Sequence, residues 1–490
     1  MSRTRQFARK VRRLIVYVAG AAVVVLVVFI VATNVIGSRV RQQLHEKLTS
    51  KGLTPDLFRH HDTTRRSIEP DHNGAPFYRA AFMLIDSLDV PTEDMDELPY
   101  VGDADVPALG VPLQPDLLSA IEIHLQARAM FFALVDVAHR SDSWRFDIPP
   151  LSPDIGLFTP EMTLAARTLL LRAVWASASG SNEAALGACE HILGLNVAGQ
   201  ELRWPAIIVQ RTAVAQIARR ALEQCLSRTV LDIVGLLRLR EYASRASMSF
   251  DVTTLVESDI VESADQLFNV PQHLARRRAA LELIRRGDEY VITPSFEEAV
   301  TIALAMKATD WEFEQIIPGY MPAPDTRIGT NLLSLWQLMC PGAFTLKASK
   351  SVEAKLAFYE SLPNVEDEMS TYVLSHAQST ESHGGVRQSA IACSHVLGAV
   401  ASLRVAATAL TVEAHRLEHL RWPEDLAELG EIDVSDPFSG ASLMFKKTSD
   451  GCLIYSIGIN GQDDAGHWGD DDDDLSFRLF VPDLRNAVAK

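Results

Sequence analysis

Cysteine is scarce in this chain, and the motifs of several large enzyme classes are missing. Its 490 residues include five cysteines, widely spaced and without a C-x-x-C pair, so neither a zinc ribbon nor a thioredoxin motif is present. Buried free thiols are the favoured interpretation, with one or two disulfide bonds as the alternative in an oxidising compartment. No G-x-S-x-G motif, phosphate loop or dinucleotide fingerprint occurs. These absences favour a protein that is not an enzyme.

Positive charge is in short supply outside the N-terminus. The net charge is −17, and residues 1–13 hold six cations and no acid, so the rest of the chain carries −23. Such a body repels DNA, RNA and anionic lipid, and we predict no nucleic-acid partner. The hydrophobic share of 47% and charged share of 22% are globular values. The length predicts two or three structural units.

One long hydrophobic run occupies residues 14–36 and contains no charged residue. A helix needs about 20 apolar residues to cross a bilayer, whereas the core of a signal peptide usually has about 7–15. We therefore predict an uncleaved transmembrane helix at 14–36, with residues 1–13 as a cytoplasmic tail because of their positive charge. We expect no later segment to be long and apolar enough to cross back. The prediction is a single-pass protein of the inner (cytoplasmic) membrane, with residues 37–490 periplasmic or extracellular.

Helical patterns dominate the middle of the chain. Residues 37–155 are predicted as membrane-proximal helices and loops, beginning with a polar continuation of the anchor helix. Residues 156–384 are predicted as an α-hairpin helical array, because successive segments with apolar residues every three or four positions are joined by short connectors. In its first helix we expect Thr159 as the cap and Pro160 just inside. Grooves between α-hairpins suit a protein partner.

The pattern changes within residues 385–490. A long helix with one apolar stripe is predicted from Val386 to about Leu420. Three short alternating runs follow, SLMFKK, CLIYSIG and LSFRLF, and Gly451 is available for a hairpin turn between the first two. The predicted fold class is therefore mostly α, with a long C-terminal helix and a small antiparallel β-sheet that together form an α+β region.

Seven aspartates and four glycines are concentrated in residues 455–474. Calcium takes about six to eight oxygen ligands, and glycines let a backbone fold back tightly around an ion. The spacing is not that of an EF-hand. We predict a Ca²⁺ site whose candidate ligands are Asn460, Asp463, Asp464, Asp472 and Asp473. The alternative is a solvated acidic loop without an ion.

The segments EAHRLEHLRWPEDLAELG, DPFSGASLMF, YSIGINGQDDAG and DDL resemble the C-terminal half of the major pseudopilin of type II secretion systems, over roughly residues 386–480. The resemblance implies a pseudopilin-like long helix, small sheet and calcium-binding loop. One alternative function is therefore that of a component of a type II secretion or pilus-like assembly. Two loop positions depart from the family, whose aspartate falls on Asn460 and whose first glycine falls on Ala465. The acid-free span at 14–36 also lacks the family's glutamate, which argues against pilus assembly. As a whole, the chain resembles uncharacterised single-pass bacterial envelope proteins.

Residues 415–419 read HRLEH, which matches the H-x-x-E-H signature of inverted zinc peptidases. The two histidines would share a helix face, but such a site needs a third protein ligand. A zinc-dependent hydrolase is therefore the second alternative. The favoured hypothesis is a membrane-anchored, extracytoplasmic, non-catalytic scaffold that binds a protein partner and carries the calcium loop.

Overall fold

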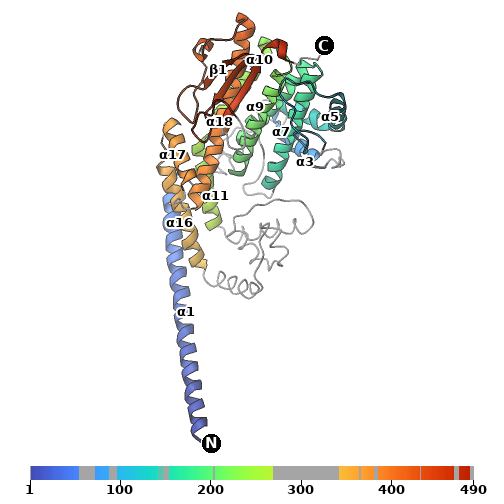
Figure 1. Cartoon of the computed structure of the whole chain (residues 1–490). Coiled ribbons are helices and arrows are strands. Elements are labelled where there is room, and N and C mark those ends of the chain that lie inside the picture. Colours follow the sequence, from blue (N-terminus) through green and yellow to red (C-terminus); the bar gives the residue numbers. More distant parts are fainter. Residues whose placement is uncertain are drawn as a thin grey trace. The chain divides into compact units, whose positions relative to one another are not determined.

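The computed structural model describes residues 2–53, 72–87, 97–141, 143–144, 146, 154–201, 205–268, 341–363, 366–379, 384–430, 432–467 and 474–485. These residues are mostly helical, with one three-stranded antiparallel sheet near the C-terminus (Figure 1). The predicted mostly α class with a small α+β region is therefore confirmed. Two compact units are present, one made of Met1–Leu57 with Ile260–Ala357 and the other of Phe58–Asp259 with Phe358–Lys490.

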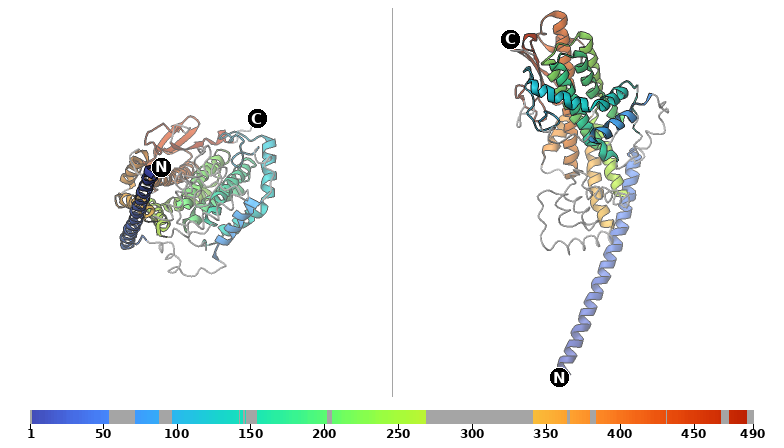
Figure 2. Two further views of the ribbon diagram at one scale, coloured as in Figure 1. Left: turned by 90° about the horizontal axis from the view of Figure 1, so that it is seen from below. Right: turned by 90° about the vertical axis from the view of Figure 1, so that its right-hand side faces the viewer.

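Helix α1 of the first unit runs without a break from Ser2 to Ser50 (Figure 2). The expected helical continuation beyond the apolar run is therefore confirmed, and the helix ends before Gly52, whose φ is +73°. Near this end Leu44 and Leu48 are buried. Within and next to the apolar run the exposed large apolar side chains are Tyr17, Val24, Val25, Val27, Val28, Phe29, Val31, Val35 and Ile36.

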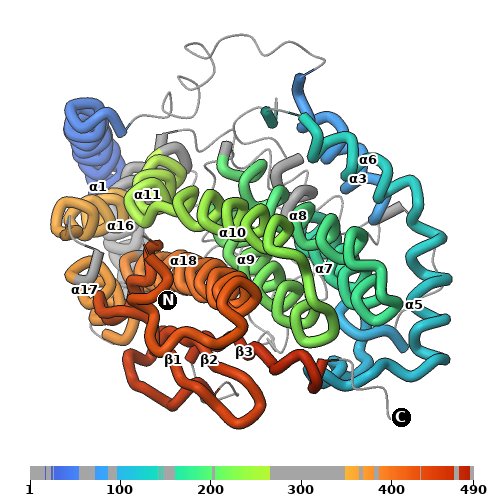
Figure 3. The backbone as a smooth tube through the Cα atoms, turned by 90° about the horizontal axis from the view of Figure 1, so that it is seen from above, coloured from blue at the N-terminus to red at the C-terminus, as the bar shows by residue number. Residues whose placement is uncertain are grey.

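Helix α18 (Gly384–His419) is the centre of the second unit. It packs against α9, α10, α17 and two strands of the sheet, and α7 and α8 pack on α9 from the other side (Figure 3). The remaining bounds are α3 (Ala75–Ser87), α5 (Pro115–Ala127), α6 (Ala129–His139), α7 (Asp154–Ala178), α8 (Asn182–Ala198), α9 (Pro205–Leu226), α10 (Ile233–Met248) and α17 (Glu366–Gln378). Two further helices, α11 (Val252–Phe268) and α16 (Pro341–Glu360), contribute residues to both units.

Burial of α18 extends well beyond the single predicted stripe. Stripe residues such as Ala390, Cys393 and Leu403 are buried, and so are Val405 and Val412 on other faces. Within α18, Val386–His419 form an unbroken helix that is long and apolar enough to cross a membrane, and 72% of its most apolar window is buried in the fold. The expectation that no later segment meets this criterion is therefore wrong. Protein neighbours on several sides explain the composition, because a helix buried all round is apolar all round.

Several helix ends follow their local signals, and one does not. Asp232 caps α10 by accepting a hydrogen bond from the Gly235 amide at 2.7 Å. Helix α7 begins at Asp154, so Thr159 is not its cap and Pro160 lies inside the helix. The expected start was wrong because a proline in the second turn removes only one backbone hydrogen bond, which the rest of a long helix can offset.

The sheet has the order β1–β2–β3, with β1 (Met444–Thr448), β2 (Gly451–Ser456) and β3 (Leu475–Phe480) all antiparallel. The predicted hairpin is confirmed at Gly451, where a Cβ would lie 1.8 Å from the Leu479 carbonyl oxygen. On one face of the sheet the paired Ile454 and Phe477 are fully buried, and β2 and β3 pack against α18. The predicted three-stranded antiparallel sheet is therefore confirmed, and two of its strands, β2 and β3, pack on the long helix.

Side chains of α9 cover the free edge of β3. Arg219 donates to the Ser476 carbonyl, and a Glu223 carboxylate oxygen accepts from the Arg478 amide at 2.8 Å. The two α9 side chains also form an ion pair of 3.7 Å. Because unpaired strand edges invite pairing with other chains, this cover protects the edge. It also attaches the sheet to the helical array.

Candidate functional site

The acidic loop leaves β2 at Ser456 and folds back over the outer face of the sheet. Gly458, Gly461 and Gly466 all have positive φ, as a tight glycine-hinged bend requires. A Cβ on Gly466 would lie 2.4 Å from Leu453 Cδ2 and 3.2 Å from Tyr455 Cδ1. Only glycine therefore lets the loop pack this closely on β2.

Three of the five predicted ligands lie in the described part of this loop. Asn460 donates through Nδ2 to Asp464 Oδ2 at 2.7 Å. Asp463 Oδ1 accepts from the Tyr455 hydroxyl at 3.0 Å and from the Ala465 amide at 2.9 Å. The other two, Asp472 and Asp473, lie outside the described residues. The loop thus brings two carboxylates and an amide oxygen into one turn, where hydrogen bonds hold their side chains.

Asp474, directly before β3, is the most unusual of the loop carboxylates that the structure describes. Its side chain is fully buried, at 0% exposure, and its Oδ2 accepts from the Gly466 amide at 2.8 Å. The other oxygen, Oδ1, is buried without a hydrogen-bond partner among the described residues. Burial raises the pKa of Asp474, the hydrogen bond from the Gly466 amide acts against that shift, and the nearby charges of Asp464 and Asp463 add to it, so the net pKa is raised. Such a group needs a proton or a cation to offset its charge.

A second buried aspartate, Asp436, ties the loop to the segment before β1. Its carboxylate accepts from the Phe438 amide at 3.0 Å, the Ser456 hydroxyl at 2.8 Å and the Ile457 amide at 3.1 Å. It therefore holds the first residues of the loop in place. Our ligand set omitted both Asp436 and Asp474. The DPF segment, which came from the family resemblance, was the sequence signal for Asp436, whereas Asp474 belongs to the run of aspartates at 470–474 from which Asp472 and Asp473 were chosen.

The H-x-x-E-H motif lies at the C-terminal end of α18. The rings of His415 and His419 stack with centroids 4.2 Å apart, so the predicted shared face is confirmed. His415 Nε2 lies 3.5 Å from Glu428 Oε2, and Glu418 is exposed. Across all the described residues, no group of three or more His, Cys, Asp or Glu side chains has a metal-binding arrangement. The zinc-hydrolase alternative stays a prediction.

A buried polar cluster that the sequence did not reveal lies where α3, α6, α8 and α10 meet. The His139 ring lies 4.8 Å from that of His191 and 5.3 Å from that of Tyr242. A Cβ on Gly194 would lie 2.6 Å from His139 Nδ1, so glycine allows this close approach. Within the described residues, the Nδ1 atoms of both histidines and the Tyr78 hydroxyl are buried without hydrogen-bond partners. The histidines are isolated in the sequence, and only the packing of four helices brings them together.

Protonation of these histidines is unfavourable. Burial, together with the smaller effects of the neighbouring His139 and of nearby arginines, lowers the pKa of His191 to about 3. Burial also lowers the pKa of His139, although Asp136 acts against that shift. Both rings are therefore neutral near pH 7.

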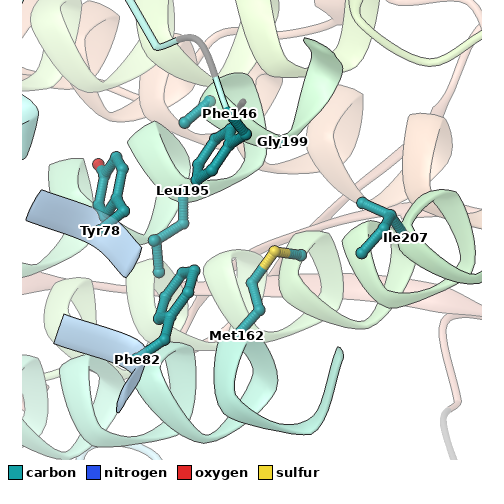
Figure 4. A pocket seen from close by; sticks show the side chains of 8 residues that line it. Tyr78, Phe82, Phe146, Met162, Leu195, Gly199 and Ile207 are labelled. Atoms are coloured by element: carbon teal, nitrogen blue, oxygen red, sulfur yellow. The ribbon is translucent and has the colours of Figure 1, made fainter. Parts of the chain in front are cut away.

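An apolar pocket lies beside this cluster (Figure 4). It is lined by Tyr78, Phe82, Phe146, Met162, Leu195, Ala198, Gly199 and Ile207. Its free volume is about 10 Å³, which is room for about one water molecule. Sites for small organic molecules usually measure about 300–1,000 Å³. The pocket is therefore a packing defect and not a ligand site.

No protein-family model, curated protein or solved structure matches this chain. The pseudopilin resemblance of the C-terminal region thus stays a prediction from its motifs.

Proposed function

We propose that this protein is a non-catalytic scaffold, anchored in the membrane by α1, which presents its helical unit and sheet to a protein partner outside the cytoplasm. The anchor is supported by the exposed apolar side chains of α1, such as Val28 and Phe29. Exposing this much apolar surface to water is unfavourable, whereas lipid accommodates it. The cations of residues 1–13 support a cytoplasmic N-terminus.

Calcium in the acidic loop is the second part of the proposal. The observation that carries it is the fully buried carboxylate of Asp474, with one oxygen lacking a partner beside Asp463 and Asp464. Among the described residues, no Lys or Arg forms an ion pair with these three carboxylates. A divalent cation would neutralise the loop and draw its oxygens together. Asp472 and Asp473 are the further ligands that we propose.

Thermal unfolding of the full-length protein in detergent, with calcium and with chelator, tests this site. We expect calcium to raise the Tm, because an ion that binds only the folded state stabilises it. Asp474→Asn should abolish that rise and should also raise the Tm in chelator, since it removes a buried charge. Asp483→Asn is the matched control, because Asp483 is an exposed aspartate just beyond β3. A wild-type Tm that does not respond to calcium would remove the ion from the proposal.

The membrane and partner proposals need separate tests. The wild-type protein should stay in the membrane pellet after alkaline carbonate extraction, and its release would contradict an α1 anchor. A protease added outside intact spheroplasts should digest residues beyond α1 and leave the N-terminal tail protected. Cross-linking in intact cells should then capture one recurrent protein partner, and repeated failure to capture any would remove the scaffold role.

A further inference from the structure

Two buried cysteines lie side by side in the helical array. Cys189 of α8 and Cys225 of α9 have their Sγ atoms 3.6 Å apart, and each residue is only 1% exposed. The two helices pack directly against each other. Cys225 Sγ also donates to the Ala173 carbonyl of α7 at 3.5 Å. The sulfurs are thus in contact but not bonded, because a disulfide bond is about 2.05 Å long.

The other described cysteines lack such a neighbour. Cys393 lies in α18 and Cys452 in β2, and both are buried free thiols. Among the described residues, the pair of Cys189 and Cys225 is the one close contact between two sulfurs. In a disulfide bond the two sulfurs would lie about 1.6 Å closer than they do here, and the packing of α8 on α9 is what brings these two cysteines together.

We propose that Cys189 and Cys225 form a disulfide bond that joins α8 to α9. The electron acceptor is a disulfide-containing oxidant, either a protein disulfide or oxidised glutathione. One thiolate attacks the oxidant's disulfide, a mixed disulfide forms and one oxidant sulfur leaves as a thiolate. The second cysteine, as a thiolate, then displaces the other oxidant sulfur and forms the Cys189–Cys225 bond. The two cysteine protons and two electrons end on the oxidant, which becomes a dithiol or two thiols.

The bond forms before the array is fully packed. Both sulfurs are inaccessible in the folded protein, and the hydrogen bond with Cys225, together with burial, raises the pKa of the Cys189 thiol. A thiol that is buried and protonated reacts slowly with an oxidant. The disulfide exchange therefore takes place while the chain is still folding and the two thiols are accessible.

The bond would stabilise the part of the array that holds the sheet. It closes a loop between positions 36 residues apart. It also fixes α9, whose Arg219 and Glu223 bind the edge of β3. Its formation in cells rests on the extracytoplasmic location proposed above, because the cytoplasm keeps thiols reduced. The pairing of Cys189 with Cys225 does not depend on that location, because it rests on the contact between their sulfur atoms.

The test has one arm in cells and one with purified protein. In the first arm, cells are lysed in an alkylating agent, and the full-length protein is denatured and digested without reductant for mass spectrometry. We expect one linked peptide pair containing Cys189 and Cys225. In the second arm, reduced protein is unfolded and refolded in a glutathione redox buffer with detergent, and we expect the same pair. Oxidised protein should melt about 5 °C above reduced protein.

Matched variants separate this bond from other effects. Cys225→Ser can keep the hydrogen bond to the Ala173 carbonyl but should lose the linked peptide and the Tm difference. Cys393→Ser changes an equally buried cysteine and should keep both. If the pair fails to form in the refolding arm, or cysteines pair differently there, the disulfide is refuted. If it forms on refolding but not in cells, the disulfide chemistry stands and the extracytoplasmic location is refuted.

Discussion

Replacing Glu413 with glutamine should destabilise the second unit more than any comparable change at a surface ion pair. Its side chain is 0% exposed, and its carboxylate accepts hydrogen bonds from Arg485 Nη1 at 2.6 Å and Nη2 at 2.8 Å. It also accepts hydrogen bonds from Arg416 Nε at 2.9 Å and Nη2 at 2.8 Å. One buried carboxylate of α18 therefore pairs with two guanidinium groups and anchors the segment after β3. Glutamine keeps the shape but leaves the arginines without an anion.

The expected loss follows from general magnitudes for such pairs. Removing one partner of a buried ion pair costs about 3–5 kcal/mol, because it leaves an uncompensated buried charge. A unit of roughly 330 residues has an unfolding entropy of about 0.7 kcal/mol/K. Glu413→Gln should therefore lower the Tm by about 6 °C. The control is Glu424→Gln, which breaks the exposed pair with Lys447 at 2.8 Å and should cost below about 1 kcal/mol.

Calorimetry of the full-length protein in detergent measures this loss of stability. It should be applied to Glu413→Gln, to Arg485→Gln and to their double variant. The double variant should lose much less stability than the sum of the two single losses, because both changes break the same contacts. Burial alone raises the pKa of Glu413, but hydrogen bonds from Arg416 and Arg485 outweigh it, so the net pKa is lowered. The carboxylate therefore stabilises the fold above the unfolded pKa of about 4.3, and this contribution is lost as the pH falls through the folded pKa. If the Glu413→Gln variant had the same Tm at pH 7 as the Glu424→Gln control, the reasoning would be refuted.

Three further predictions concern the acidic loop and the histidine cluster. Ala465 has φ +61°, so Ala465→Gly should relieve up to about 1–2 kcal/mol of backbone strain and stabilise the fold; the Tm should rise, and an unchanged or lower Tm would contradict this. Gly466→Ala should destabilise the protein in chemical denaturation, because the new methyl group would overlap Leu453; a neutral effect would mean that the loop can move away from β2. The pKa of His191 is lowered to about 3 in the folded protein, mainly by burial, whereas in the unfolded chain it is about 6.5. The neutral ring therefore contributes to stability above about pH 6.5, and this contribution is lost as the pH falls from about 6.5 towards about 3. His191→Gln should flatten the curve of stability against pH between about 6.5 and 4, and an unchanged curve would contradict the burial of this ring.

Local patterns in the sequence were enough to predict many individual elements. The apolar stripe of α18, the alternating residues of β1 to β3 and Gly451 in the hairpin each depend on residues that are close together in the sequence. Their effects are therefore readable without the fold. The same holds for the glycine-hinged bend that carries Asp463 and Asp464.

The tertiary structure alone decided which distant groups meet. Glu223 and the Arg478 amide are 255 residues apart in the chain, and Cys189 and Cys225 are 36 apart. No local rule pairs such positions, because their contact depends on how the helices pack. Seven aspartates in one stretch look alike in sequence, yet among those that the structure describes Asp474 alone is fully buried, because the residue after it begins β3 and takes it into the interior. Composition predicted an acidic loop, and the rest of the fold determined that the carboxylate of Asp474 is buried.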